Sequence, residues 1–108
     1  MKLLSRQEEM LLLAVWRLQH DAYGVLIREK LKEITGKEWA FGAIFTMLDR
    51  LVHKELLTSY LTDPTPERGG RSKRIYQLTI DGKKALVEIK QIEKAMWEGI
   101  EGIGLENN

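Results

Sequence analysis

The residues of this sequence that are best suited to chemistry are basic side chains gathered in one short segment. Residues 67–74 read ERGGRSKR and carry four cations against one anion, although the whole 108-residue chain is nearly balanced, with 17 basic and 16 acidic side chains. Clustered cations can neutralise phosphates and release counterions. The segment therefore favours a phosphate-binding loop, and an ordinary solvated loop is the alternative. The residues concerned are Arg68, Gly69, Gly70, Arg71, Lys73 and Arg74.

Catalytic and metal-binding patterns are weak in the rest of the chain. Neither His20 nor His53 has a metal-binding partner three or four residues further along the chain, and there is no cysteine for a thiolate ligand or a thiol nucleophile. The glycines at 99, 102 and 104 reverse the spacing of a dinucleotide-binding fingerprint and follow a predicted helix in place of a strand. The sequence therefore predicts no enzyme, no metal and no cofactor.

The composition predicts one folded domain. A chain of 108 residues has room for a single core, and 44% apolar against 31% charged residues is typical of a globular protein. No apolar run approaches the roughly 18 residues of a membrane span, and the first ten residues, MKLLSRQEEM, lack the features of a signal peptide. Together with the lack of cysteine, these features predict a cytoplasmic protein without a membrane partner.

Local signals predict three helices in the first half of the chain. Ser5 and Glu8 have the spacing of a capping box, which opens a helix that runs to about Leu18. This helix is apolar on all sides over 11–16, which predicts cover from a second chain. A second helix is expected over 23–35, with Asp21 as a cap and Gly36 at its end, and a third over 40–54. The apolar positions of the second helix are Val25, Ile27, Leu31 and Ile34.

The pattern changes in the second half of the chain. Residues 57–61 and 72–78 read as short strands, and the segment between them, with its prolines and glycines, predicts a hairpin loop. Thr79 then caps a helix that is expected to reach about Glu101, with apolar residues in steps of four and three. At that length the helix projects beyond the core, so packing against a partner is favoured over packing on its own domain.

Three helices, a hairpin and a further helix are the order of a winged helix-turn-helix. We predict a mainly α fold with a β-hairpin wing, in which residues 1–78 form a winged-helix DNA-binding domain. Residues 79–108 are expected to form a dimerisation helix and tail that continue the same domain. In such folds the third helix enters the major groove and the wing lies along the backbone or minor groove, which predicts double-stranded DNA as the partner.

Several segments together resemble the PadR family of bacterial transcriptional regulators. The most specific runs from Glu67 to Gly82 and reads ERGGRSKRIYQLTIDG; it is joined by LLLAVWRL at 11–18, AYGV at 22–25, GAIF at 42–45 and LDRL at 48–51. The resemblance covers roughly residues 4–90. It implies a homodimeric repressor that binds a palindromic operator, dimerises through its first and last helices and responds to small molecules. Ala40 and Phe45 depart from the Ser and Tyr that are frequent in the family.

Candidate DNA contacts follow from this placement. Thr46 can donate to a base or a phosphate, and Ala43 can touch a thymine methyl. The set is poor in Arg, Asn and Gln, so we predict that specificity depends partly on DNA shape and deformability. Besides the cations and glycines of the wing, the candidates are Tyr23, Lys37, Phe41, Gly42, Ala43, Phe45, Thr46 and Arg50, and Phe41 and Phe45 fit the core equally well.

Large apolar side chains on the first and last helices predict a dimer interface. Trp16 and Trp97 are best explained as packing residues of this interface. Alternatively, they line a site for a small apolar or aromatic effector between the subunits. The residues assigned to the interface or the ligand are Leu12, Trp16, Ile89, Ile92, Met96, Trp97 and Ile100. A winged-helix module that binds protein in place of DNA is a further alternative, which the basic segment disfavours.

Overall fold

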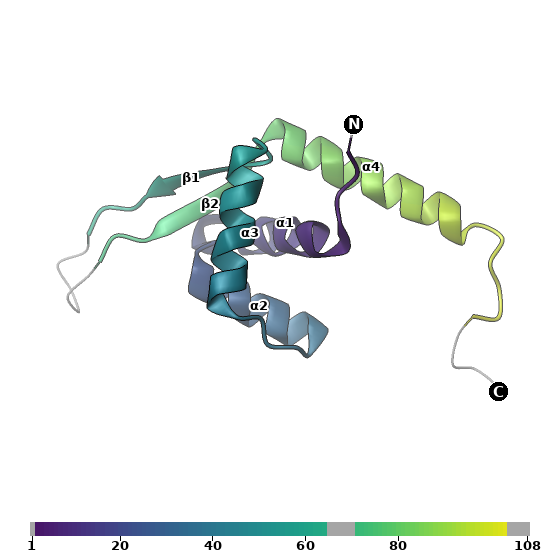
Figure 1. The fold of residues 1–108 in the computed structure, drawn as a ribbon, viewed down its shortest axis with the longest axis horizontal. Coiled ribbons are helices and arrows are strands. Elements are labelled where there is room, and N and C mark those ends of the chain that lie inside the picture. The colour runs from purple at the N-terminus through teal and green to yellow at the C-terminus, as the bar shows by residue number, and fades with distance from the viewer. Residues whose placement is uncertain (1, 65–70, 104–108) are drawn as a thin grey trace.

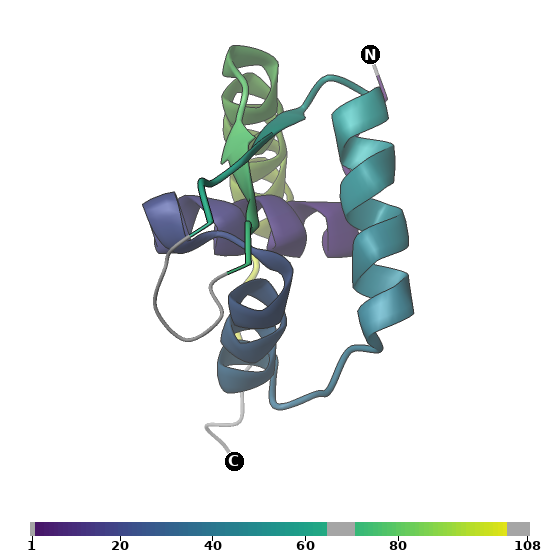
Figure 2. The same ribbon diagram turned by 90° about the vertical axis from the view of Figure 1, so that its left-hand side faces the viewer.

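The computed structural model describes residues 2–64 and 71–103 and confirms a mainly helical winged-helix fold with a two-stranded antiparallel hairpin. Helices α2 and α4 lie on opposite sides of α1 in two perpendicular views (Figures 1 and 2). The elements are α1 (Arg6–Leu18), a 3-10 turn (Gln19–Asp21), α2 (Gly24–Thr35), α3 (Phe41–His53), β1 (Leu57–Leu61), β2 (Arg74–Leu78) and α4 (Ile80–Trp97).

Helix α1 forms the centre of the core and begins at the predicted capping box. The Glu8 N–H donates to Ser5 Oγ (3.1 Å), and the Ser5 N–H donates to the Glu8 carboxylate (2.9 Å). Leu13 and Trp16 remain exposed, so the described residues leave part of the surface of this helix uncovered. The core residues are Leu11, Leu12, Ala14, Val15, Ala22, Ile27, Leu31, Ile44, Leu48, Leu51, Leu57 and Tyr76.

Helix α2 begins at Gly24, with Tyr23 as its extended N-cap residue and without a side-chain cap. The prediction of Asp21 as the cap is wrong, because Asp21 belongs to the 3-10 turn that links α1 to α2. Gly36 ends the helix with a φ of 74°, the left-handed conformation expected there. Ile27 and Leu31 are buried as predicted. Val25 and Ile34 are exposed, because only one narrow stripe of α2 faces the core.

Helix α3 and the hairpin follow the predicted order. Ala40 has the extended backbone of an N-cap residue but no side-chain oxygen to accept a hydrogen bond. The strands pair from Leu57 opposite Leu78 to Leu61 opposite Arg74, so β2 begins two residues later than predicted. The Tyr76 N–H donates to the Ala22 carbonyl (2.9 Å), which ties the base of the hairpin to the turn before α2.

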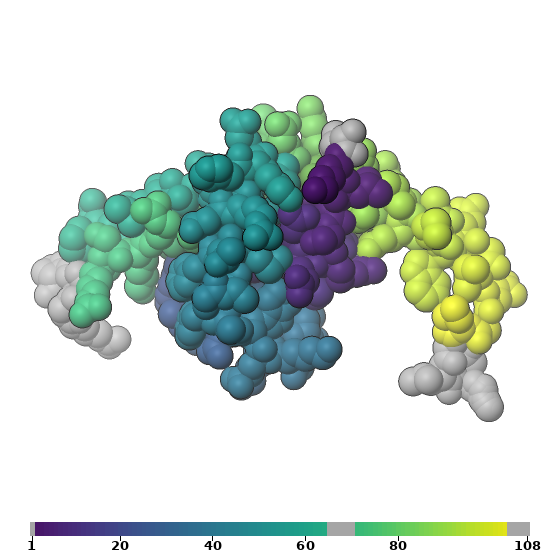
Figure 3. Space-filling view, in the orientation of Figure 1, coloured from purple at the N-terminus to yellow at the C-terminus, as the bar shows by residue number. Residues whose placement is uncertain are grey.

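Helix α4 begins at the base of the hairpin and leaves the core within two turns. Thr79 Oγ1 accepts from the Gly82 N–H (3.0 Å) and donates to the Glu55 carbonyl (2.7 Å). The second half of α4 projects from the body on the side opposite the hairpin (Figure 3). The helix ends at Trp97 and not at Glu101 as predicted. The backbone of Glu98 is no longer helical, and Gly99 has a φ of 78°.

In the described segments, no helix is both long enough and apolar enough to cross a membrane.

Candidate nucleic-acid interface

The N-terminal half of α3 presents small and aromatic side chains to solvent. Ile44, Leu48 and Leu51 occupy the stripe of α3 that faces the core. The predicted recognition residues on this half, which are Phe41, Gly42, Ala43, Phe45 and Thr46, are all exposed. The sequence left open whether Phe41 and Phe45 belong to the core or to the surface, and the structure places both at the surface.

Phe41 and Phe45 form an aromatic pair that α2 supports. Their ring centroids are 6.3 Å apart with 18° between the planes, which is a stacked arrangement. The guanidinium carbon of Arg28 lies 4.4 Å from the centroid of the Phe41 ring. The Phe45 ring lies so close to Gly24 that a Cβ added there would sit 2.6 Å from Phe45 Cζ. Helix α2 therefore holds both rings from one side.

Arg28 also fixes the connection between α2 and α3. Its Nε donates to the Trp39 carbonyl, and its Nη2 lies 3.9 Å from Glu38 Oε1. Lys32 pairs with the same carboxylate at 3.2 Å; this hydrogen bond and the charge of Arg28 lower the pKa of Glu38. Trp39 packs against the core. Lys37 is exposed in the same connection.

The approach to β2 places one cation, Lys73, next to the start of α2. Lys73 Nζ lies 4.5 Å from the centroid of the Tyr23 ring, and the Lys73 N–H donates to Thr62 Oγ1 (2.8 Å). Arg74 Nη1 donates to Ser59 Oγ (3.0 Å). Two residues that the sequence analysis named separately, Tyr23 and Lys73, thus lie together.

The remaining DNA-contact candidates are spread more widely. Arg71 is exposed in the segment that precedes β2. Arg50 is exposed in the third turn of α3, beyond the aromatic pair. Arg68, Gly69 and Gly70 lie outside the described residues. In the segments that the structure describes, no group of three or more His, Cys, Asp or Glu side chains could hold a metal ion.

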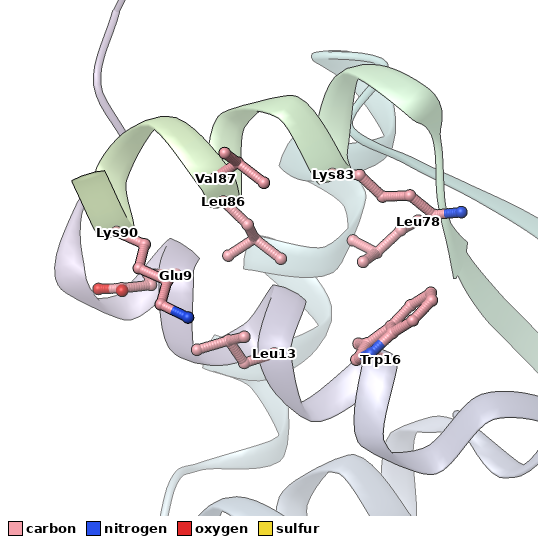
Figure 4. A pocket seen from close by; sticks show the side chains of 8 residues that line it. All are labelled: Glu9, Leu13, Trp16, Leu78, Lys83, Leu86, Val87 and Lys90. Atoms are coloured by element: carbon pink, nitrogen blue, oxygen red, sulfur yellow. The ribbon is translucent and has the colours of Figure 1, made fainter. Parts of the chain in front are cut away.

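A second feature is an apolar cleft of about 620 Å³ between α1 and α4. The cleft is lined by Leu13 and Trp16 from α1 and by Leu86 and Val87 from α4 (Figure 4). The Nζ of Lys83 lies 5.1 Å from the centroid of the Trp16 ring. The other lining residues are Glu9, Leu78 and Lys90.

Glu9 is a buried carboxylate beside another acid. Arg6 Nη1 bridges Glu9 Oε1 (3.1 Å) and Glu93 Oε2 (2.7 Å), which links α1 to α4. Burial and the neighbouring Glu93 carboxylate raise the pKa of Glu9. Burial also raises the pKa of Glu8, but hydrogen bonds from Lys54 and from the Ser5 N–H outweigh it, so the net pKa of Glu8 is lowered.

The residues assigned to a dimer interface or a ligand have different positions. Leu12 is a core residue: it is fully buried in its own chain, which corrects its assignment to an interface. Ile89 and Ile92 are half-buried on α4. Trp16, Met96 and Trp97 are exposed by 50%, 73% and 59%, and Ile100 is exposed beyond the end of the helix.

Two residues that shape the exposed half of α3, Arg28 and Gly24, were not predicted from the sequence. No contact of Arg28 with Phe41 or Trp39 was expected. Gly24 was expected only as part of the AYGV motif and not as a contact of the Phe45 ring. No local signal reveals either contact, because both join α2 to residues more than ten positions away.

An exposed N-terminal half of the third helix, followed by a hairpin with basic side chains, defines a winged-helix nucleic-acid-binding protein. The sequence model of the transcriptional regulator PadR-like family matches residues 12–88, and the chain belongs to this family. The membership confirms the predicted resemblance and identifies a DNA-binding transcriptional regulator, not an enzyme. No functionally curated protein matches the chain.

Solved structures of similar proteins share the fold. A PadR family regulator from hypervirulent Clostridium difficile is 31% identical, with a TM-score of 0.63, 82% of this chain covered and 93% of that one. A PadR-like transcription factor from Bacteroides fragilis is 28% identical, with a TM-score of 0.68 and coverage of 91% and 93%. RosR from H. salinarum is 25% identical, with a TM-score of 0.69 and coverage of 90% and 80%.

Proposed function

We propose that this regulator is a homodimeric repressor that binds a palindromic operator and releases it when a small apolar or aromatic effector binds. Two features carry the proposal: the N-terminal half of α3 is exposed, and a cation of the hairpin, Lys73, lies beside the start of α2. Family membership supports the DNA-binding part. In this proposal residues 1–78 contact DNA, and residues 79–108 join the two subunits.

The DNA contacts divide into two kinds. Exposed cations and the Tyr23 hydroxyl contact phosphates and set the register, while the first turns of α3 meet base edges. The phosphate contacts are Tyr23, Lys37, Arg50, Arg68, Arg71, Lys73 and Arg74, with Gly69 and Gly70 allowing close approach. The base contacts are Phe41, Gly42, Ala43, Phe45 and Thr46. Two such surfaces in a dimer occupy half-sites about one helical turn apart, or a small multiple of it.

The dimer contact uses the surfaces that the chain leaves uncovered. The exposed part of α1 around Trp16 and the projecting half of α4 with Met96 and Trp97 are both apolar, and burying such patches stabilises association. Ile89, Ile92 and Ile100 extend this surface along α4 and past its end. The cleft beside Trp16 lies next to it and has the size of a small-molecule site.

The effector part is tested by tryptophan fluorescence. Planar aromatic compounds bound beside Trp16 are expected to change its emission, and Trp16→Phe is expected to remove that change whereas Trp97→Phe keeps it. Binding is also expected to lower operator affinity, because a ligand shifts an equilibrium only by its differential affinity for the two states. Unchanged emission and unchanged operator affinity across a panel of such compounds would contradict this part.

The DNA-binding part is tested by a salt series on the DNA upstream of the protein's own gene. Wild type is expected to bind selectively, with an affinity that falls linearly in log salt. Arg71→Ala and Lys73→Ala are each expected to reduce the slope by about one for each lost phosphate contact, which is about two for a dimer on both half-sites. Lys94→Ala, an exposed change on the far half of α4, is the matched control and should leave the slope unchanged. An absence of binding even at low salt would favour the alternative, a winged-helix module that binds protein.

A further inference from the structure

We propose that α3 selects its half-site through the methyl groups of thymines, which Phe41 and Phe45 contact in the major groove. This inference rests on the proposed function, since it requires α3 to lie in the groove of the operator. It adds the chemistry by which the base sequence is read and the two side chains that read it.

The first step is the chemistry of the exposed half of α3. Between Ala40 and Thr46 there is no Arg, Lys, Asn or Gln, and Thr46 is the one polar side chain. Guanine and adenine are read by bidentate hydrogen bonds from such side chains, whereas thymine presents a C5 methyl to the major groove that favours apolar contact, phenylalanine included. The side chains on this half of α3 therefore match thymine better than any other base.

The second step is that the two rings are already in place. Phe41 and Phe45 are exposed by 41% and 44%, yet their rings stack at 6.3 Å. Arg28 over the Phe41 ring and Gly24 against the tip of the Phe45 ring support the pair from α2. A braced apolar surface loses little side-chain freedom when a partner covers it, so a contact as small as a methyl group becomes measurable.

The third step identifies DNA as the occupant of this apolar patch. Exposed cations lie near it: Lys37 precedes α3, Arg50 follows the pair on α3, and Lys73 has its Nζ 4.5 Å from the ring of Tyr23, the neighbour of Gly24. An apolar patch framed by cations fits base edges between two phosphate backbones. Arg28, the cation closest to the rings, already donates to the Trp39 carbonyl, which makes it a brace for the pair and a poor reader of guanine.

The experiment starts from duplexes that the wild-type protein selects from a randomised DNA pool. Each thymine of the selected half-site is then replaced in turn by deoxyuridine, which keeps the base pair and removes only the methyl group. We expect at least two thymines per half-site at which the replacement weakens binding about fourfold, the effect of one buried methyl group. Replacements outside the half-sites should leave binding unchanged.

Protein variants connect the methyl effect to the two rings. Phe41→Ala and Phe45→Ala are expected to bind thymine and deoxyuridine duplexes equally at the positions that they contact. Phe41→Leu keeps an apolar contact and should retain part of the discrimination. Ile80→Ala removes an even more exposed apolar side chain from α4 and should retain all of the discrimination. Melting temperatures of all variants show whether a loss of binding reflects a loss of folding, and the deoxyuridine series needs only the wild type.

Each outcome decides one of the two claims. Selected sites with equal affinity for thymine and deoxyuridine duplexes would overturn the methyl readout while operator binding stands. A discrimination that persists in both Phe41→Ala and Phe45→Ala would also overturn it, because other side chains would then read the methyl groups. If no sequence is enriched from the pool, the proposed operator function itself is wrong.

Discussion

The N-terminal half of α3 and the C-terminal half of α4 both expose large apolar side chains, but the residues that the structure describes support only the pair on α3. The aromatic pair on α3 rests on Gly24 and Arg28 of α2. The buried residues of α4, by contrast, are Gly82 and Ala85 in its first turns, and the end with Met96 and Trp97 projects from the body.

This difference distinguishes a surface that is preorganised for its partner from one that is stabilised only when the partner covers it. A braced apolar surface has little freedom left to lose, which suits a partner that must be matched in register, such as base edges. An unsupported apolar helix end gains more from being covered, because burial itself supplies the stabilisation. We infer that the α3 surface is ready before DNA arrives, whereas the α4 surface is completed by the second subunit.

The largest effect is expected at the joint that fixes α4 to the rest of the molecule. A Cβ at Gly82 would overlap the Leu56 carbonyl oxygen, which also accepts from the Thr79 N–H (3.1 Å). Gly82→Ala is therefore expected to lower the free energy of unfolding by about 3 kcal/mol in urea titrations. Gly42→Ala, where nothing lies within 4 Å, is the control and should keep or raise stability, by up to about 1 kcal/mol. Equal effects of the two changes would contradict this account of the joint.

The next effect concerns the unsupported end of α4. Trp97→Glu places a charge where we propose that the second subunit packs, and it should weaken the dimer by about 2 kcal/mol, the value of a large apolar side chain. Sedimentation equilibrium would show this change as a shift towards monomer. Lys84→Glu, an exposed charge reversal on the first half of α4, is the control and should leave the association unchanged. Monomeric wild-type protein at all concentrations would remove the basis of the comparison.

A smaller effect is expected at the start of α3, where the braced surface lacks a side-chain cap. Ala40→Ser adds a hydroxyl that can accept from the free N–H groups of the first turn, and it should raise the free energy of unfolding by about 1 kcal/mol. Ala43→Ser makes the same chemical change at an exposed position inside the helix and should lower stability by a few tenths of a kcal/mol. A gain at both positions would show that capping is not its cause.

The smallest effect is a dependence on pH where α1 meets α4. The pKa of Glu9 is raised, so its contribution to stability is complete below the ordinary value near 4.5 and is lost as the pH rises through the higher pKa of the folded protein. Glu9→Gln should therefore gain stability relative to wild type as the pH increases above about 4.5 in thermal melts.

Glu8 provides the opposite sign on the same helix turn. Its pKa is lowered, so its contribution is present above the ordinary value and is lost as the pH falls through the lower pKa of the folded protein. Glu8→Gln should lose stability relative to wild type at neutral pH, and the difference should shrink in acid. The same pH trend in both variants would show that the Lys54 and Glu93 contacts do not control these carboxyl groups.

Most of the fold could be predicted from the sequence because its signals are local. The capping box at Ser5, the left-handed end at Gly36 and the Thr79 cap each depend on residues within one helical turn, and each is present. Errors arose where tertiary support decides the outcome. The apolar pattern of the last helix continues past Trp97, but the backbone leaves the helix there, beyond the reach of the core.

The sequence by itself determined the order of the elements, the basic character of the hairpin and the residue types on the N-terminal half of α3, since these depend on spacing and residue type. Only the tertiary structure decided that Leu12 is in the core while Trp16 is not, and that Arg28 and Gly24 hold the aromatic pair. Such contacts depend on how α2 crosses α3, and a crossing is set by packing of the whole core and by no single local pattern.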